Sequence, residues 1–484
     1  NIYASFIGYL SPHFPLLKSK QREIVQNFNF DINLKNTSAL TEFIFPRITL
    51  GDGLKIYGDF NNDSRGFDIN IQSPTLGFDR SLLYDVNMYL RATKEDSELN
   101  LFISKLDYDN TTKLEQFEFN HIGHFGDFRF GLGWLSPDSL NFDGIIRGET
   151  HVDNHSLNVL FDESEFYFAD TLWSLSDSSI LQYLEEQFEA ELLLHTSSQK
   201  VALKYASNSS SSLLDLNLFD FEINNLSPWI SRVQSSVDGS VGGRFHISNN
   251  DSNRIIISDL ITDNLILNGD LFGALDLVID YDEINHHQNI QGQVRKDSMK
   301  SIDFSGIYFP MIDSNNFYLS LDVKDFNLHH LQSYLRVIDD LQGIGSGSLN
   351  FHGAVNNPEF YGEFFIDDVR LEIPYLDVSL SSIGNSTVSL SEKHIEFNEF
   401  DFEGFEGNNK VGYGDLKGEL FHDHFRDFIL ALNVEMDSLL TLNTDIQKDE
   451  SYYGKVIASG DAIISGPTDA ISIDLNVVSD KGTE

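Results

Sequence analysis

The chain has 484 residues, of which 41 % are hydrophobic and 12 % aromatic, so it can bury a large apolar surface and is not intrinsically disordered. Its 75 acidic residues oppose 32 basic ones, and the net charge of −43 excludes binding through the phosphate backbone of nucleic acid. The absence of cysteine excludes disulfides, thiolate nucleophiles and cysteine-ligated metals.

The first predicted elements are strands with one apolar and one polar face. Phe28, Phe30 and Ile32 alternate with polar residues, which is the period of a strand that is buried on one side only. Segments 53–60 and 67–71 have the same character and are predicted to form a hairpin.

The connection of this hairpin, residues 61–66, faintly resembles a calcium-binding loop. Such a loop needs Gly at its sixth position and a carboxylate at its twelfth, where this chain has Ser64 and Asn70. A turn is therefore predicted here rather than a metal site. Another loop is predicted at the Ser-rich segment 207–212.

Three short helices are predicted among the strands, within residues 5–14, 225–239 and 328–343. The third is the clearest, because its apolar residues recur at helical spacing and Gly343 follows shortly after them.

A weak internal repeat involves the last two of these helices. Each is followed by a Gly-rich strand, 240–247 or 345–353, and then by further alternating strands. The period is roughly 100 residues.

Alternating strands continue to the end of the sequence, for example over 362–373 and 470–479. Strands with one apolar face need a partner for that face, and about 35 to 40 of them exceed a single sandwich or barrel. The predicted fold class is therefore all-β. We expect an elongated, groove-like ribbon (a β-taco) of repeating strands, with an apolar lumen and a few short helices.

No motif with catalytic chemistry stands out. The segment 343–348, GIGSGS, precedes a strand and lacks the lysine of a phosphate-binding loop. His422 and His424 could share a strand face, but no third metal ligand accompanies them. The tryptophans are predicted to be core anchors: Trp134, Trp173 and Trp229.

Two sets of Gly, Pro and Tyr residues carry a family resemblance. The pattern YYGxVxASGxxxIxGP is formed by Tyr452, Tyr453, Gly454, Val456, Ala458, Ser459, Gly460, Ile464, Gly466 and Pro467. An upstream block contains Gly353, Pro358, Gly362, Pro374, Tyr375 and Leu376. In the order and spacing of these motifs, over about residues 220–484, the chain resembles the TamB family of AsmA-like envelope proteins. The earlier stretch 160–181 is similar to the weaker repeats of TamB relatives from the Bacteroidetes.

The resemblance implies a β-groove in the periplasm of a Gram-negative bacterium, bridging the inner and outer membranes. Its lumen would carry the acyl chains of phospholipids. The implied partners are the inner membrane, through an N-terminal helix, and an outer-membrane β-barrel of the BamA or TamA type, through an extreme C-terminal segment. We expect both of these parts to lie beyond the present sequence.

The chain is accordingly predicted to be a lipid conduit and not an enzyme, with no cofactor, no metal and no nucleic-acid partner. Residues 1–220 are predicted as diffuse TamB-like repeats, 221–340 as a groove repeat that opens with a short helix, and 341–484 as a TamB-like groove segment. The predicted groove-lining residues are Leu349, Phe351, Phe364, Ile366, Leu371, Ile373, Leu430, Leu432, Val434, Ile464, Ile473, Leu475 and Val477.

Two other functions remain open at this point. One is a scaffold for the assembly or secretion of outer-membrane proteins, which would pair with their strands through an exposed sheet edge. The other is a β-solenoid adhesin or a polysaccharide-acting enzyme, which clustered surface aromatic residues with paired carboxylates on one face would favour.

Overall fold

The computed structural model describes residues 10, 13, 27–35, 37, 48–61, 66–78, 80–109, 111–137, 142–153, 155–168, 170–226, 237–250, 252–267, 269–296, 299–334, 338–355, 357–423, 426–444 and 453–484. The chain divides into two units, each described here by itself. Unit 1 comprises Asn1–Val233 with Val241–Ser252, and unit 2 comprises Gln234–Ser240 with Asn253–Glu484.

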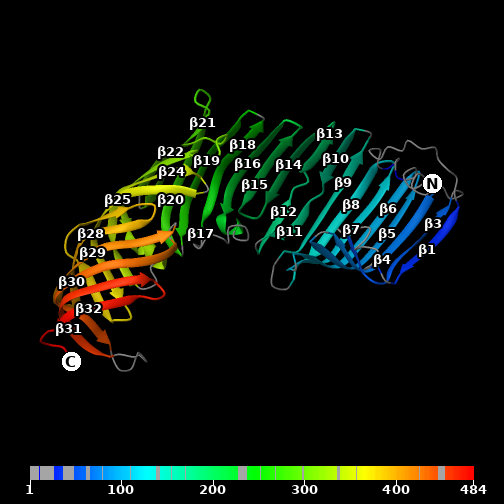
Figure 1. Ribbon diagram of the computed structural model, residues 1–484. Coiled ribbons are helices and arrows are strands. Elements are labelled where there is room, and N and C mark those ends of the chain that lie inside the picture. The colour runs from blue at the N-terminus through cyan, green and yellow to red at the C-terminus, as the bar shows by residue number, and fades with distance from the viewer. Residues whose placement is uncertain are drawn as a thin grey trace. The chain divides into compact units, whose positions relative to one another are not determined.

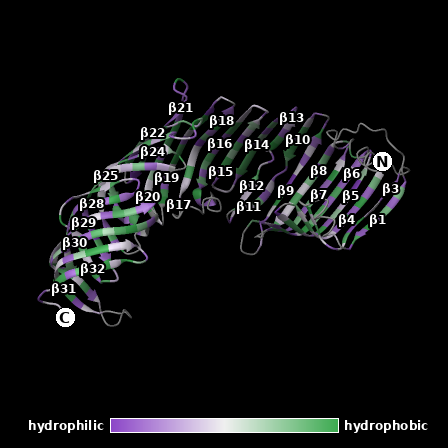
Figure 2. Cartoon of the chain, in the orientation of Figure 1, coloured by the Kyte–Doolittle hydropathy of each residue, from purple (hydrophilic) through white to green (hydrophobic). Residues whose placement is uncertain are grey.

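The prediction of an all-β fold is confirmed. The described residues form 32 strands and two short 3₁₀ helices, and in both units strands that follow one another along the chain lie side by side as antiparallel ribbons (Figure 1). Along the strands hydrophobic and hydrophilic residues alternate (Figure 2), because successive side chains of a strand point to opposite faces of its sheet.

Unit 1 contains the elements β1 (Phe28–Leu34), β2 (Ile48–Leu50), β3 (Leu54–Asn61), β4 (Gly66–Phe78), β5 (Ser81–Thr93), β6 (Asp96–Tyr108), β7 (Thr111–His124), β8 (Asp127–Leu135), β9 (Gly144–Val152), β10 (Ser156–Phe161), β11 (Ser164–Phe168), β12 (Thr171–Leu175), β13 (Ile180–Leu184), β14 (Gln187–His195), β15 (Lys200–Ser207), β16 (Ser211–Glu222), η1 (Ile223–Leu226) and β18 (Ser240–Asn250). Two neighbouring strands of this ribbon are interrupted. β9 and β14 therefore each pair with two short strands, β9 with β10 and β11, and β14 with β12 and β13.

Unit 2 contains β17 (Val237–Asp238), β19 (Arg254–Leu267), β20 (Asp270–Asp282), β21 (His287–Lys296), β22 (Met299–Tyr308), β23 (Phe317–Asn327), η2 (Leu328–Tyr334), β24 (Asp339–Ala354), β25 (Asn357–Ile373), β26 (Val378–Ser382), β27 (Ser386–Leu390), β28 (His394–Glu406), β29 (Asn409–Asp423), β30 (Arg426–Thr444), β31 (Gly454–Pro467) and β32 (Ser472–Ser479). β26 and β27 likewise form one interrupted strand between β25 and β28.

Both predicted connections between strands are observed as hairpins. Asn61 pairs with Gly66 where β3 is followed by β4, as expected for a hairpin. In the Ser-rich segment, Ser207 pairs with Ser212 and the Asn208 N–H donates to the Ser211 carbonyl at 2.9 Å. This segment is thus a tight turn inside unit 1.

The third predicted helix does not extend over its whole predicted segment. Among the described residues of 328–343, Leu328–Tyr334 form a 3₁₀ helix, and β24 already begins at Asp339. Asp339 pairs with Glu372 of β25, so strand pairing takes up the backbone groups that a longer helix would have used. Most of the other two predicted helices, residues 5–14 and 225–239, lies outside the described residues.

Aspartates bend the strands. Nine of the sixteen non-glycine residues with positive φ among the described residues are Asp, including Asp325, Asp340 and Asp368 in the successive strands β23, β24 and β25. The register shifts between Val323 and Phe326 of β23, which marks a β-bulge around Asp325. Bulges kink a strand and increase its twist, so a file of them curves the sheet of unit 2.

Part of unit 2 curls far enough for strands that are not neighbours to meet. The Asn443 N–H of β30 donates to the Leu376 carbonyl, just after β25, at 2.9 Å. Next to this bond Val378, Leu440 and Ile457 form a buried cluster. The apolar side of the sheet therefore turns inward here and forms a core.

Elsewhere the apolar sides remain largely uncovered. The chain exposes 28414 Å² of surface, whereas two compact globular units of half its mass would together expose about 22,000 Å². Each unit is thus closer to a single curved layer than to a globule. No helix in the described part of the chain has the length and apolar character required to cross a membrane.

Candidate functional site

An unbroken row of side chains crosses the sheet of unit 2, one residue from each strand in turn. Each member is the cross-strand partner of the next, so all of them lie on one face. Only the first is polar, and none is charged. We name this the unit 2 apolar row: Thr262, Leu275, Val294, Ile302, Val323, Gly347, Phe364, Val388, Phe397, Gly418, Leu432, Ile464 and Ile473.

A parallel row lies two residues away on the same face, and it contains glycines next to large side chains. Gly292 lies opposite Phe304, and Gly362 lies opposite Leu349. A Cβ on Gly292 would collide with the Phe304 ring, so that ring lies across the glycine backbone. Glycine thus makes room for a flat apolar surface, as in the aromatic rescue of glycines in sheets.

All thirteen predicted groove-lining residues are described by the structure. Four belong to the unit 2 apolar row itself, and Leu349 and Leu430 belong to the parallel row. The remaining strand positions share this face by their pairing or by their packing against its buried clusters: Phe351, Ile366, Leu371, Ile373, Val434, Leu475 and Val477. That they contact lipid stays a prediction.

The burial of this face varies along the ribbon. Val434 is buried in a cluster with Phe402 and Ala462, whereas Phe364 and Leu432 are half-buried. On β32 Leu475 is 63 % exposed. Within the row, four members are themselves buried: Thr262, Val294, Val323 and Val388. The half-exposed members between them can contact an apolar ligand without first being uncovered.

The 3₁₀ helix η2 lies on this same face of unit 2. Leu328 packs in a buried cluster with Leu341 and Val369, and Ile366 and Leu371 contact that cluster. The predicted lining residues of β25 are thus partly covered by a side chain of η2. Any apolar ligand that follows the row must pass beside Leu328 or displace it.

Unit 1 carries an apolar row of its own, which the sequence reasoning did not single out. Its eight members again pair in succession from β1 to β9. We name it the unit 1 apolar row: Ile32, Ile56, Ile71, Met88, Leu101, Phe119, Leu132 and Ile146. The same period-2 alternation could have identified these residues, but only where the strands of the sequence could be aligned in register.

A core stack closes one side of this face in unit 1. Phe60 is 3 % exposed and lies between Phe28 and Phe67, with ring centroids 5.0 and 5.2 Å away. Leu10, which precedes β1 in the chain, packs onto the same cluster. Beyond it, Ile71, Met88 and Leu101 are half-buried.

No cluster of three metal-ligating side chains occurs over the described ranges. His422 is stacked on Phe360 with ring centroids 5.6 Å apart, and its predicted companion His424 lies outside those ranges. The segment 343–348 belongs to strand β24.

Two of the three tryptophans are described. Trp173 is 2 % exposed and packs against Phe221, in agreement with its prediction as a core anchor. The Trp134 indole N–H donates to the Phe142 carbonyl and its ring is half-buried. Trp229 lies outside the described residues.

Comparison with known proteins adds no further identification. No protein-family model matches the chain, and no curated protein or solved structure is significantly similar to it.

Proposed function

We propose that the chain is a segment of a lipid conduit, in which the acyl chains of phospholipids lie along the apolar rows while their headgroups stay in water. One observation carries the proposal: in each unit, uncharged and almost exclusively apolar residues follow one another across adjacent strands without a break. Exposure of an acyl chain to water costs a free energy of about 0.8 kcal/mol for each CH₂ group. A continuous apolar file offsets that cost at every step along its length.

Such a conduit needs no catalytic group, because passage changes no covalent bond. What it needs is weak, repeated contact, so that a lipid is held without being trapped. Half-buried Leu, Ile and Phe side chains meet this requirement, since none of them forms a closed pocket around a ligand.

The resemblance to the TamB family extends the proposal to the setting of the conduit. On that basis the chain would lie in the periplasm of a Gram-negative bacterium and carry phospholipids between the inner and outer membranes in support of outer-membrane biogenesis. Its partners would be the inner membrane and a β-barrel of the BamA or TamA type.

The test is the amount of phospholipid that co-purifies with the protein after expression in a Gram-negative host, measured by mass spectrometry of an organic extract. Leu432→Asp places a charge in the unit 2 apolar row and is expected to lower bound phospholipid several-fold. Asn433→Asp adds the same charge at the adjacent, outward-facing position and serves as the matched control.

Leu475→Asp provides a second variant that does not disturb a packed site, because Leu475 is 63 % exposed. It should also reduce bound lipid while leaving the thermal unfolding midpoint unchanged. Equal lipid content in the Leu432→Asp and Asn433→Asp proteins, or no phospholipid in the unmodified protein, would contradict the proposal.

A further inference from the structure

The middle of strands β4 to β7 carries an unusual set of side chains on the face opposite the unit 1 apolar row. Two adjacent files of cross-strand partners each combine amide side chains with one aromatic ring. We name this set the amide face: Asn70, Tyr89, Asn100 and Asn120 in one file, and Gln72, Asn87, Phe102 and Glu118 in the other.

These residues contradict ordinary strand preferences. Asn is depleted in strands, where β-branched and aromatic residues are preferred, yet five of the eight positions are Asn or Gln. Only Glu118 is charged, in a chain of which 22 % of residues are charged. Positions where a sequence departs from a local rule without a local gain are expected at functional sites.

Hydrogen bonds within the protein leave several of these amides available to a ligand. Asn100 donates to the Glu98 carboxylate at 2.9 Å, and Asn87 donates to the Asp85 carbonyl at 3.1 Å. Over the described ranges, the side chains of Asn70, Gln72 and Asn120 form no hydrogen bond. Each such amide offers two donors and an acceptor to a ligand.

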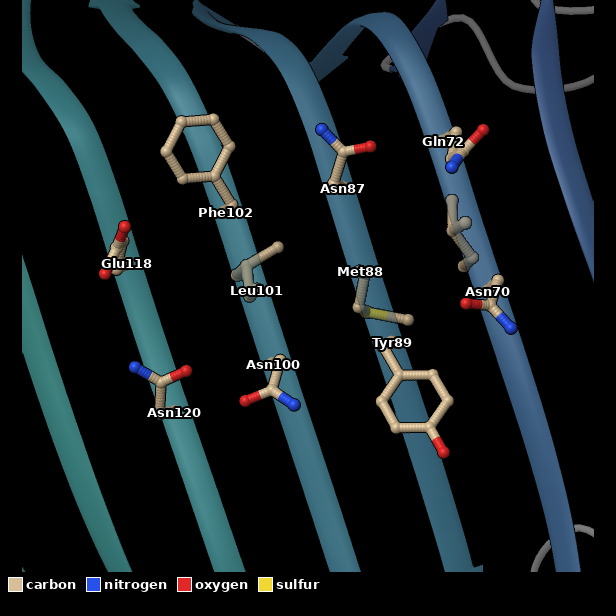
Figure 3. A pocket seen from close by; sticks show the side chains of 11 residues that line it. Asn70, Gln72, Asn87, Met88, Tyr89, Asn100, Leu101, Phe102, Glu118 and Asn120 are labelled. Carbon is tan, nitrogen blue, oxygen red and sulfur yellow. The ribbon is translucent and has the colours of Figure 1, made fainter.

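The aromatic rings lie between the amides. The view onto the sheet shows the rings of Tyr89 and Phe102 face on, with Asn70 and Asn100 beside Tyr89 and with Asn87 and Glu118 beside Phe102 (Figure 3). Both rings are half-buried, so each offers a broad apolar face to solvent. A flat surface of rings framed by amides results, and it forms a shallow hollow over the four strands.

The surroundings of the hollow are open on one flank and charged on the other. The next strand continues the two files with Gly131 and Gly133, which carry no side chain and leave the surface open. On the other flank, Asp59 and Asp68 pair across β3 and β4. Asp68 in turn pairs with Arg91, and Arg91 pairs with Glu98, so a file of charged side chains borders the amide face on this side.

We propose that the amide face binds an uncharged polysaccharide that lies across strands β4 to β7. A sugar ring has an apolar face of C–H groups and a rim of hydroxyls. Tyr89 and Phe102 fit the C–H face, and the free amides of Asn70, Gln72 and Asn120 fit vicinal hydroxyls or acetamido groups, because an amide donates and accepts side by side.

Other ligand classes fit this face less well. Single-stranded nucleic acid also stacks on aromatic rings, but the net charge of −43 and the absence of any Lys or Arg among the eight residues oppose its phosphates. A phospholipid tail cannot form hydrogen bonds, so its binding would remove water from five amides without replacing those hydrogen bonds. The inference does not depend on lipid transport, because the two sites lie on opposite faces of the sheet.

The test is binding of the purified chain to insoluble chitin, followed as the bound fraction in a pull-down with chitohexaose as the soluble competitor. The double variant Tyr89→Ala/Asn120→Ala is expected to weaken binding at least ten-fold. Tyr361→Ala/Asn433→Ala is the matched control, since it removes one exposed tyrosine and one exposed asparagine from unit 2. This control should bind as the unmodified protein does.

Asn120→Ala alone guards against a folding artefact, because Asn120 is exposed and its amide is free. It should retain the unmodified thermal unfolding midpoint and still lose affinity several-fold. Failure of the unmodified chain to bind chitin or cellulose would overturn the proposal, as would equal losses in the double variant and its control. Competition by single-stranded DNA as strong as that by chitohexaose would also overturn it.

Discussion

At the residue scale, the fold depends on glycines that lie beneath large side chains. Gly148 of β9 pairs with Phe130 of β8, and a Cβ at Gly148 would lie 3.0 Å from that ring and would collide with the Leu160 carbonyl oxygen. Gly133 lies on the other face of β8, and a Cβ added to it would have no neighbouring atom closer than 3.9 Å. The two glycines therefore have different roles although both lie in strands.

Gly148→Ala is expected to destabilise unit 1 by about 1–3 kcal/mol, the usual cost of forcing an additional carbon into a packed site. Gly133→Ala, at an unobstructed position on the neighbouring strand, should change stability by less than about 0.5 kcal/mol. Urea unfolding midpoints of the two variants test this difference. Equal midpoints would contradict this prediction, because they would show that the packing of the Phe130 ring does not require a glycine at position 148.

A buried histidine gives unit 1 a sensitivity to acid. His121 is 4 % exposed, its Nε2 lies 2.8 Å from the Ser97 hydroxyl, and its ring packs on Phe128. Burial lowers the pKa of His121 to about 4, and the charge of nearby His13 contributes in the same direction. The folded protein therefore favours the neutral imidazole.

Because the pKa of His121 is lower in the folded than in the unfolded chain, its contribution to stability is complete above about pH 6.5 and is lost as the pH falls towards 4. The urea midpoint of the unmodified protein should decrease over this range. His121→Gln retains a hydrogen-bonding group for Ser97 but cannot titrate, so its midpoint should vary less with pH. The exposed-site variant His155→Gln should follow the unmodified protein, and a His121→Gln curve parallel to both would refute this account.

At the element scale, bulges determine which residues of a strand face inward. In β25, Phe364 and Ile366 share a face with Val369 and Leu371 although their numbers differ in parity. The change occurs at Asp368, which has a φ of 50°. Asp tolerates this backbone conformation better than most residues do, so part of the acidic excess of the chain serves its curvature.

This element also shows how much could be predicted from the sequence. The alternation of Phe364 with Ile366, and of Leu371 with Ile373, is a local pattern, so strand and inward face could both be predicted. The pairing of Gly347 with Phe364 was not predictable, because register is a property of two strands and not of one. The segment after Leu328 was predicted as a longer helix, since its helical spacing did not reveal that β25 would pair with Asp339.

At the scale of the whole molecule, both units share one design: a curved antiparallel layer with an apolar row on one face. The predicted lining residues all lie in unit 2, and the corresponding row of unit 1 was missed because its register emerges only from the paired strands. The amide face was missed for a related reason, since its amides are spread over four strands and converge only across the sheet.

The proposed conduit predicts that lipid contacts only one face of each strand. Site-specific photocrosslinking in cells of a Gram-negative host tests this most directly, with probes at Phe364 and Leu432 in the unit 2 apolar row. Matched probes at Phe365 and Asn433, the adjacent exposed positions, serve as controls. We expect phospholipid adducts at the first two positions and none at the controls. Equal labelling of both faces, or adducts with protein alone, would contradict the conduit and indicate an assembly scaffold instead.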